Sequence, residues 1–529
     1  MDKNNYNFPK EMFEFANKGE KLHDQKFEDK PIGYFKDAWI RFRKNKASIV
    51  AAIIIIGIVL FSLLMPLFNS RYDSTFLDVY YAKKGPYSPW MSDNLGIMNG
   101  GTKRTVSERG LSWLLAAGVG AEHTRENLES GKKVTVGDGL DSFYSVVIKH
   151  KESGKGLDGK PRYSTKVNTY MEVGFVYMTI EQSEYQKILD WEKENGIQVL
   201  YPMIANNEYT YTPLDVTNAN YWYKTIKSKG DPIRVNDNGS VTKISTKDTA
   251  VYEDNYKRDA EGNVVYYEYT GGGSMDTAQY KVRVLYYNYY IYQNGFEPSY
   301  IFGTDSQGYD LALRMADGIK LSLLVSLTVS FINFFIGAIY GAIAGYYGGI
   351  VDLTMERITD ILAGIPSIVV MTLFQIHLAQ KVGVIPSLLF AFVLTGWIGM
   401  SSRVRTQFYR FKNQEYVMAA RTLGARDRRI IWKHIFPNTL GTIITGSVLA
   451  IPGVIFTESM LSFLGIVNLG GAETTSLGTL LSDASNIWTN YPYLMLFPAM
   501  IISLLMICFN LFGNGLRDAF NPSLRGVEE

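Results

Sequence analysis

The sequence predicts an all-α polytopic membrane protein with six transmembrane helices, into which an extracytoplasmic α+β domain is inserted. Two features of the 529-residue chain lead to this prediction. Long apolar runs occur at about residues 47–68 and again after about residue 319. Between them lies a polar, tyrosine-rich stretch of roughly 230 residues, which is long enough for one soluble domain or two small ones.

The first apolar run, 47–68, has about 20 uncharged residues, enough to cross the hydrocarbon of a membrane. Residues 1–36 carry charges of mixed sign, and the N-terminal segment 1–46 does not resemble a cleaved signal peptide, so we expect this span to remain in the membrane. Basic residues precede the span and acidic residues follow it, which predicts a cytoplasmic N-terminal segment. The basic residues are Arg41, Arg43, Lys44 and Lys46, and the acidic ones are Asp73 and Asp78.

Five further spans are predicted in the second half of the chain, at about 319–345, 358–379, 383–402, 438–463 and 491–513. Counting alternately from a cytoplasmic start places 69–318 outside the cell membrane, and 403–437 and the tail 519–529 inside. The loop 403–437 is more basic than any other short loop, as the positive-inside rule requires. We therefore divide the chain into the first span, an inserted domain at 69–300 and a membrane core at 301–518.

The inserted domain is expected to contain mainly strands. Residues 163–180 and 280–292 are rich in aromatic and β-branched residues with rough alternation, which favours strands. Residues 183–196 begin with serine and end with glycine, which favours a helix. The many tyrosines either form a recognition surface or belong to a strand-forming core with an amphipathic surface, and we favour the core.

Several classes of function lack support in the sequence. Residues 154–160 read Gly-Lys-Gly-Leu-Asp-Gly-Lys, but Pro161 replaces the hydroxyl residue that a phosphate-binding loop needs, so we predict a hairpin turn. The five histidines are scattered, and we find no nucleophile–base or metal-ligand spacing. The net charge of +2 is uninformative about nucleic acid, but no compact basic domain with interleaved aromatic residues stands out, so we expect no nucleic-acid partner. We therefore expect no catalysis and no cofactor on this chain.

The loop 403–437 carries the strongest functional pattern. Residues 415–423 suit a short helix, in which Ala419 and Ala420 leave a shallow face where another protein can approach closely. Gly424 stands where such a helix would end in a left-handed cap. A second short basic segment follows at 427–434, and Pro437 then opens the fifth span at a first-turn position. Two short helices between spans suit mechanical coupling, whereas the arginines alone would indicate only a basic loop.

The complete pattern resembles the EAA loop of ABC importer permeases, in which a coupling helix docks on an ATPase subunit. The resemblance rests on Ala419, Ala420, Gly424 and the pair Phe436-Pro437. Met418 occupies the position of the consensus acidic residue, and Glu415 lies three residues earlier, which is usual in the peptide-importing branch. The resemblance implies contacts to the ATPase from Glu415, Ala419, Ala420, Arg421, Gly424, Ala425 and Pro437.

Other segments resemble the C-type permease of oligopeptide and dipeptide importers, over about 31–68 and 301–525. They include Phe302-Gly-Thr-Asp-Ser-Gln-Gly-Tyr-Asp before the second span and Glu458-Ser-Met-Leu-Ser-Phe-Leu-Gly from the outer end of the fifth. Tyr309 departs from the family, which commonly has arginine there. The resemblance implies a chain embedded in the lipid membrane with four partner chains: a homologous B-type permease, two cytoplasmic P-loop ATPases that bind ATP and Mg, and an extracellular peptide-binding lipoprotein.

The insertion at about 72–299 is the main departure from this family. We expect it to dock or partly replace the lipoprotein, and a role in stability or envelope spacing is an equal alternative. Glu458 and Gln375 are candidates for the transport pathway because polar residues at membrane depth are commonly functional. The cargo could also be a nickel chelate, glutathione or a signalling peptide. A membrane sensor with an extracellular ligand-binding domain is the alternative from another class.

Overall fold

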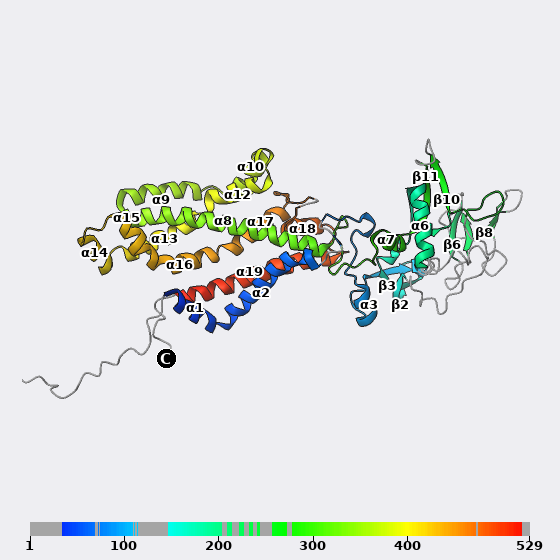
Figure 1. The fold of residues 1–529 in the computed structure, drawn as a ribbon, viewed down its shortest axis with the longest axis horizontal. Coiled ribbons are helices and arrows are strands. Elements are labelled where there is room, and N and C mark those ends of the chain that lie inside the picture. The colour runs from blue at the N-terminus through cyan, green and yellow to red at the C-terminus, as the bar shows by residue number, and fades with distance from the viewer. Residues whose placement is uncertain are drawn as a thin grey trace, which may run out of the picture.

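The chain is elongated in this computed structural model, with a helical body at one end and an α/β region at the other (Figure 1). The structure describes residues 34–68, 72, 75–108, 110–111, 114, 146–203, 209–213, 222–226, 232–235, 241–243, 257–271, 278–471 and 474–520. Most of the expected N-terminal segment and of the tail 519–529 lies outside these residues.

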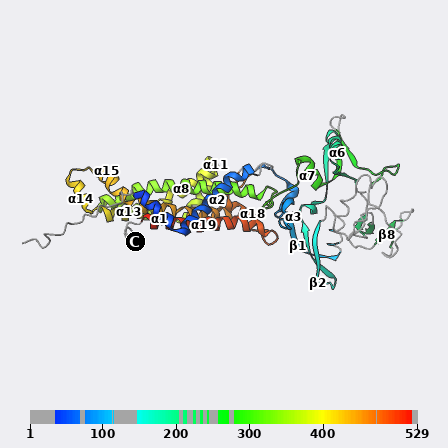
Figure 2. The same ribbon diagram turned by 60° about the horizontal axis from the view of Figure 1, so that its bottom comes forward.

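The helical body is formed by helices that run mostly along the long axis of the molecule in both views (Figures 1 and 2). They are α1 (Tyr34–Lys44), α2 (Lys46–Phe68), α8 (Leu311–Tyr347), α9 (Gly349–Ala363), α10 (Ser367–His377), α11 (Ala379–Val382), α12 (Val384–Gly396), α13 (Ile398–Phe411), α14 (Glu415–Thr422), α15 (Asp427–Arg429), the π-helix η6 (Ile430–Ile435), α16 (Phe436–Val448), α17 (Ile451–Phe463), α18 (Leu477–Ala484) and α19 (Pro492–Phe520).

Among the described residues, five helical segments are long and apolar enough to cross a membrane. They are Lys46–Leu67, Leu311–Tyr347, Val384–Phe411, Asp427–Phe463 and Pro492–Phe520. A sixth candidate, α9 with α10, is bent by 69°. The expectation of an unbroken third span at 358–379 is therefore wrong. Pro366 is the N-cap residue immediately before α10 and disfavours helical backbone in the residue before it, which accounts for the break.

A row of glycines lets α8 lie directly against α13. Gly337, Gly341 and Gly345 are spaced about one turn apart on the same side of α8. A Cβ atom at Gly337 would lie 2.8 Å from the carbonyl oxygen of Trp397, and one at Gly345 would lie 2.7 Å from that of Arg405. Small residues at such spacing allow membrane helices to pack with their backbones close together.

Because Gly341 faces the carbonyl oxygen of Ser401 most closely, Gly341→Val is expected to separate the two helices. We expect a loss of about 1–3 kcal/mol in the free energy of unfolding, as for other overpacked sites. Thermal unfolding of the detergent-purified chain measures this loss. Gly399→Val in α13 is the matched control, because a Cβ there meets open space. Equal melting temperatures for the two variants would contradict the packing role of Gly341.

The α/β region contains three antiparallel sheets among the described residues. The first has the strand order β1 (Gly101–Ser107), β3 (Pro161–Asn168), β2 (Val147–Lys155). The second has the order β10 (Tyr267–Gly271), β11 (Gln279–Leu285), β4 (Phe175–Glu181), and β5 (Leu200–Tyr201) also pairs with β11. The third is formed by β6 (Tyr209–Pro213), β7 (Trp222–Ile226), β8 (Pro232–Val235) and β9 (Val241–Lys243). The helical elements are η2 (Val79–Tyr81), α3 (Pro89–Leu95), η3 (Met171–Val173), α6 (Gln182–Asn195) and α7 (Tyr286–Asn294).

Two predictions for this region are confirmed and two need correction. The glycine-rich segment 154–160 is the turn of the β2–β3 hairpin, where the Gly156 N–H donates to the Lys160 carbonyl at 2.8 Å. The helix expected at 183–196 is α6, with Gly196 as its left-handed cap. The strand expected at 163–180 is divided into β3 and β4 by η3. The strand expected at 280–292 ends at Leu285, where α7 begins.

The tyrosines of this region form much of its core. Tyr81, Tyr170, Tyr290 and Tyr300 are among the largest fully buried side chains. The Tyr72 and Tyr300 rings stack with centroids 4.7 Å apart, and the Tyr290 hydroxyl donates to that of Tyr72 at 2.8 Å. Burial of such rings accounts for the helical course of α7, because tertiary packing overrides the strand preference of tyrosine. The interpretation of the tyrosines as core residues is confirmed for this cluster.

The same core cluster joins the α/β region to the helical body. It includes Met65 near the end of α2 and Leu313 in the first turn of α8. In the connecting loop, the Asp305 carboxylate accepts three backbone N–H bonds, and Asp310 caps α8 by accepting from the Ala312 N–H at 2.7 Å. The motif 302–310 is therefore a structural junction, and the α/β region is packed onto the span ends.

Asp78 is a buried acceptor within this region. Both of its carboxylate oxygens accept from the Tyr286 hydroxyl at 2.8 Å, and one accepts from the Tyr80 and Tyr81 N–H groups. Asp78→Ala is expected to lower the free energy of unfolding by about 1–3 kcal/mol because these donors lose their partner. Asp78→Asn keeps an acceptor and is expected to cost less. Hydrogen exchange of α7 in the full chain compares the two variants.

The pH dependence gives a second readout for Asp78. Burial raises the pKa of Asp78 above 3.8, although the bonds from Tyr286, Tyr81 and Tyr80 oppose this rise. The native state therefore holds this proton more tightly, and stability falls as pH rises from about 3.8 through the raised pKa. We expect Asp78→Asn to remove this part of the pH dependence, and an unchanged pH profile would contradict the interpretation.

Candidate functional site

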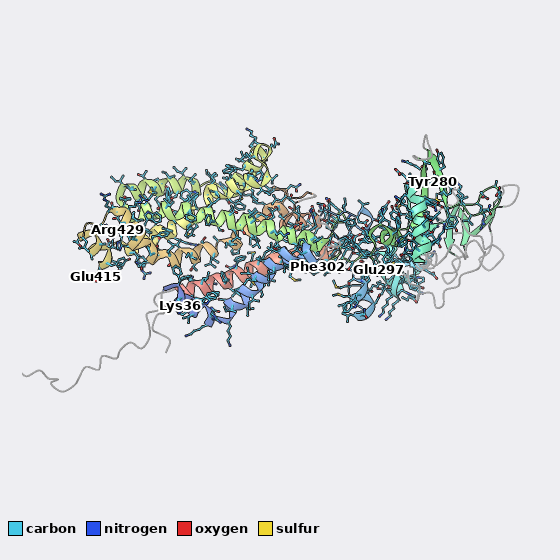
Figure 3. All side chains as sticks on the ribbon, in the orientation of Figure 1. Lys36, Tyr280, Glu297, Phe302, Glu415 and Arg429 are labelled. Carbon is cyan, nitrogen blue, oxygen red and sulfur yellow. The ribbon has the colours of Figure 1, made fainter. Side chains whose placement is uncertain are left out.

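The candidate coupling site lies at the end of the molecule opposite the α/β region. Figure 3 places Glu415 and Arg429 there, at the ends of α14 and α15. Helix α14 buries one narrow stripe, formed by Val417 and Ala420. Val417 belongs to a core cluster with Phe408 of α13 and Ile431 of η6. This cluster fixes α14 against the neighbouring helices.

The opposite side of α14 is exposed and largely uncharged. The Leu423 side chain is 88% exposed and that of Met418 is 53% exposed, and Ala419 lies between them in sequence. Gly424 ends the helix with φ +79°, so the predicted left-handed cap is confirmed. Its N–H donates to the Arg421 carbonyl at 3.0 Å. An exposed leucine and methionine at a rigid helix end suit insertion into a groove on another protein.

Tyr346, in the last turn of α8, ties this loop to the longest helix. Its hydroxyl donates to Asp427 Oδ1 at 2.5 Å, and the Arg421 guanidinium donates to the Tyr346 hydroxyl at 3.4 Å. Sequence reasoning missed Asp427 and Tyr346 as members of the site. The first-turn position of Asp427 in α15 is a signal for a helix start, but nothing local indicates its partner in α8.

The connection from α15 into the membrane is continuous. The residues expected to form a separate basic segment, 427–434, begin the candidate span Asp427–Phe463, so that expectation is wrong. Pro437 lies in the first turn of α16, as predicted, and is preceded by the π-helix η6. Proline has no N–H and its ring crowds the carbonyl four residues earlier, which favours a wider turn at this point. Movement of α15 therefore passes directly into the span.

An ion pair fixes α13, the helix that leads into α14. The Arg405 guanidinium donates to both oxygens of Asp352 in α9, at 2.5 and 2.7 Å. Glu356 lies 3.2 Å from the same guanidinium, and the Tyr409 hydroxyl donates to Asp352 at 2.5 Å. Sequence reasoning did not identify this group, because its members come from separate spans.

The other candidate residues lie apart from one another. Glu415 is exposed in the first turn of α14, and Ala425 packs partly against the core cluster of Val417. Glu458 is 1% exposed and accepts from the hydroxyls of Ser322, Ser459 and Ser462.

Gln375 is buried in α10, and its amide donates to the Val384 carbonyl at 3.4 Å. Both Glu458 and Gln375 are thus bonded within the bundle, and a role in the transport pathway stays a prediction for each. Within the described part of the chain, no cluster of histidine, cysteine and acidic residues could hold a metal.

Tyr309 stands where the family that the sequence resembles commonly has arginine. It is buried in the junction loop, and the Arg314 guanidinium of α8 lies 4.8 Å from the centre of its ring. Arg314 also lies 3.8 Å from Asp305. A cation is therefore present next to position 309, supplied from the first turn of α8.

Comparisons with known proteins match the helical parts of the chain. Residues 312–526 match the family described as binding-protein-dependent transport system inner membrane component, and residues 33–86 match the N-terminal TM domain of oligopeptide transport permease C. The oligopeptide transport system permease protein OppC of Bacillus subtilis is 42% identical over 225 residues, which are 42% of this chain and 72% of the relative. The dipeptide permease DppC of the same organism is 43% identical, covering 42% and 69%, and OppC of Escherichia coli K12 is 41% identical, covering 43% and 74%.

Among solved structures, an inward-facing form of the methionine ABC transporter MetNI matches with a TM-score of 0.33 and 16% identity, over 39% of this chain and 96% of that one. An amino acid ABC transporter matches with a TM-score of 0.31 and 14% identity, over 38% and 91%. Similarity this low adds nothing to the assignment, which depends on the sequence matches.

The candidate spans and the matched family of inner-membrane transport components together identify a multi-pass membrane permease. The chain belongs to the family of binding-protein-dependent transport inner-membrane components, in the branch of the oligopeptide and dipeptide permease C subunits. It is a transporter subunit of an ABC importer, and ATP hydrolysis in this family is carried out by separate subunits.

Proposed function

We propose that this chain forms half of the translocation pathway of an ATP-driven importer of oligopeptides or dipeptides. Relatives named for oligopeptide and dipeptide transport, each about 40% identical, support this cargo. The complete complex would contain a homologous B-type permease, two cytoplasmic P-loop ATPases that bind ATP and Mg, and an extracellular peptide-binding lipoprotein. This subunit would contribute no cofactor of its own.

The observation that carries the proposal is the form of α14. Val417 and Ala420 anchor it, whereas Met418, Ala419 and Leu423 are exposed at the end of the molecule. We propose that this loop docks in a groove of the ATPase, with contacts from Glu415, Ala419, Arg421, Gly424, Ala425 and Pro437. Ala420, which the sequence also suggested as a contact, is buried against the neighbouring helices and instead holds α14 in place. Closure of the ATPase pair would then move α14 and α15, and the continuous helix through Pro437 would transmit this movement to the membrane.

The topology that supports this arrangement has six spans, with α9 and α10 counted as one broken span. The basic residues before α2 and in the loop 403–437 favour a cytoplasmic location for both, and an extracytoplasmic location for 69–318. The inserted domain 69–300 then stands above the external mouth of the membrane core 301–518.

Affinity purification from native membranes with mass spectrometry tests the assembly. Recovery of two P-loop ATPases, a second permease and a lipoprotein is expected, and the ligand of the lipoprotein identifies the cargo. Purification without any ATPase, in a detergent that preserves such complexes, would contradict the coupling assignment. Uptake assays with peptides, nickel chelates and glutathione distinguish the cargo classes.

The insertion can be tested by removing only its outer part. The Lys257 N–H donates to the Met203 carbonyl at 2.7 Å, so the ends of segment 204–256 lie side by side. A short glycine–serine linker can therefore bridge the two ends of this segment. If the insertion docks the lipoprotein through this segment, the variant loses affinity for the lipoprotein while its melting temperature is unchanged. Unchanged affinity and uptake would contradict such docking.

A further inference from the structure

Glu458 lies where three elements of the helical body meet. It is 1% exposed and belongs to α17, the second half of the candidate span Asp427–Phe463. Its carboxylate accepts from the Ser322 hydroxyl of α8 at 2.9 Å and from the Ser462 hydroxyl of its own helix at 3.2 Å. The hydroxyl of Ser476, the N-cap residue of α18, also interacts with this carboxylate. One carboxylate therefore joins α17 to both α8 and α18.

The backbones of these three elements lie in direct contact around the carboxylate. A Cβ atom at Gly478 of α18 would lie 2.6 Å from the carbonyl oxygen of Ser459 in α17. A Cβ atom at Gly318 of α8 would lie 3.0 Å from the backbone nitrogen of Leu477, the first residue of α18. Small residues let membrane helices approach this closely. Helix α18 is therefore held against both neighbours through its backbone as well as through Glu458.

The Glu458 carboxylate depends on hydroxyl donors. Among the described residues, no basic side chain forms an ion pair with it. A buried carboxylate that loses a donor is costly, because its charge stays away from water without compensation. Moving α8 or α18 away from α17 would remove the donors that those elements supply. The arrangement therefore favours movement of the three elements as one unit.

The far end of α18 connects this unit to the α/β region. Leu480 and Ala484 of α18 belong to one core cluster with Leu311, the first residue of α8. The Leu311 N–H donates to the Gly303 carbonyl at 3.0 Å, inside the junction loop 302–310. Figure 1 places α18 between α17 and the α/β region along the long axis of the molecule. An uninterrupted series of contacts thus leads from Glu458 to the loop on which the α/β region rests.

We propose that Glu458 is a positioning residue that fastens α18 to α17 and thereby passes movement of the span Asp427–Phe463 to the junction loop. The span begins with α15 at the candidate coupling site, so a displacement there reaches Glu458 along one helical segment. Glu458 acts through hydrogen bonds to its neighbours and not through contact with the cargo. The inference rests on the proposed function for the origin of the movement, whereas the attachment of α18 does not depend on transport.

Hydrogen exchange of α18 in the purified full chain tests the attachment. Ser322→Ala removes the donor that α8 supplies. A hydrogen bond between membrane helices contributes about threefold on average, so protection of α18 should fall by about that factor. Ser326→Ala is the matched control, because this serine lies one turn later in α8 and is equally buried, but its hydroxyl donates to the Leu323 carbonyl of its own helix at 3.0 Å. We expect the control to leave exchange in α18 unchanged.

Two variants of Glu458 separate positioning from a direct role of its charge in the transport pathway. Glu458→Gln keeps an acceptor oxygen and a similar volume, whereas Glu458→Ala removes the acceptor. In the assembled importer we expect the glutamine variant to retain most peptide uptake. The alanine variant should lose about tenfold in uptake at saturating peptide while ATP hydrolysis continues. The half-saturating peptide concentration should not change, because Glu458 does not touch the cargo.

Transmission itself is measured by exchange at the junction loop. A non-hydrolysable ATP analogue bound to the assembled importer is expected to alter exchange at 302–310 in the wild type. We expect this response to be lost in Glu458→Ala and restored in Glu458→Gln. A residue that only stabilised the fold would change the basal exchange of the loop without removing its response to the nucleotide.

Three results would overturn the proposal. Equal exchange of α18 in the Ser322 and Ser326 variants would mean that the carboxylate does not fasten α18. A glutamine variant as defective in uptake as the alanine variant, or a changed half-saturating concentration, would place the charge of Glu458 in the transport pathway. A nucleotide response that persists in Glu458→Ala would exclude transmission through this residue. Failure of the wild type to assemble with any ATPase would contradict the proposed function instead, and the comparison of the serine variants would still decide whether Glu458 holds α18.

Discussion

Replacing Gly424 by aspartate is expected to abolish transport while leaving membrane insertion intact. Gly424 has φ +79°, a conformation that costs most residues about 1–2 kcal/mol but that aspartate tolerates comparatively well. A Cβ atom there meets nothing within 4 Å, so the chain itself can accept the side chain. The new carboxylate would lie next to the exposed Leu423, on the surface that we propose enters the ATPase groove.

The size of this effect follows from desolvation. A carboxylate buried without a partner costs several kcal/mol, and about 3–5 kcal/mol is typical when a buried charge is left unpaired. This corresponds to a loss of more than a hundredfold in affinity for the ATPase. Peptide uptake by intact cells, with immunoblots of the membrane fraction, measures transport and insertion together.

Gly424→Asn is the matched control for charge. Asparagine has nearly the same volume and also adopts the left-handed conformation, but it is neutral. We expect the asparagine variant to retain more uptake and more ATPase on purification than the aspartate variant. Wild-type uptake in the aspartate variant would mean that Gly424 does not lie at the ATPase contact.

The features that could be predicted from the sequence are those that depend on neighbouring residues. The end of α14 at Gly424, the proline in the first turn of α16 and the β2–β3 turn each follow from local backbone chemistry. The long apolar runs likewise indicate membrane spans without any knowledge of packing. Local preference and final structure agree at these places because no distant contact opposes them.

The remaining features depend on contacts between distant segments. Residues 286–292 have the composition of a strand, yet α7 forms because its rings pack against Tyr72, Tyr81 and Tyr300. The π-helix η6 forms where Pro437 meets a helix that continues from α15.

The Arg405–Asp352 pair is also such a distant contact, and Arg405→Gln is expected to destabilise the chain strongly. Asp352 is 6% exposed. Loss of the Arg405 guanidinium leaves its carboxylate with the Tyr409 hydroxyl as the remaining hydrogen-bond donor in this group. Because the Arg405 side chain is itself 29% exposed, solvent screens this pair in part, and its loss is expected to cost about 1–3 kcal/mol. Because α13 leads directly into α14, we also expect uptake to fall by more than ATP hydrolysis does in the assembled complex.

A double-mutant cycle distinguishes the pair from its individual members. Asp352→Asn/Arg405→Gln removes the unpaired charge and keeps side chains of similar size, so its melting temperature should recover toward the wild type. Arg357→Gln is the exposed control, because Arg357 pairs with Asp360 at 3.1 Å where both side chains are more than half exposed. Its loss should be below about 1 kcal/mol. If Arg405→Gln were as stable as the double variant, the ion pair would not be what holds α13 against α9. The glycine contacts between α8 and α13 would then have to position the coupling loop alone.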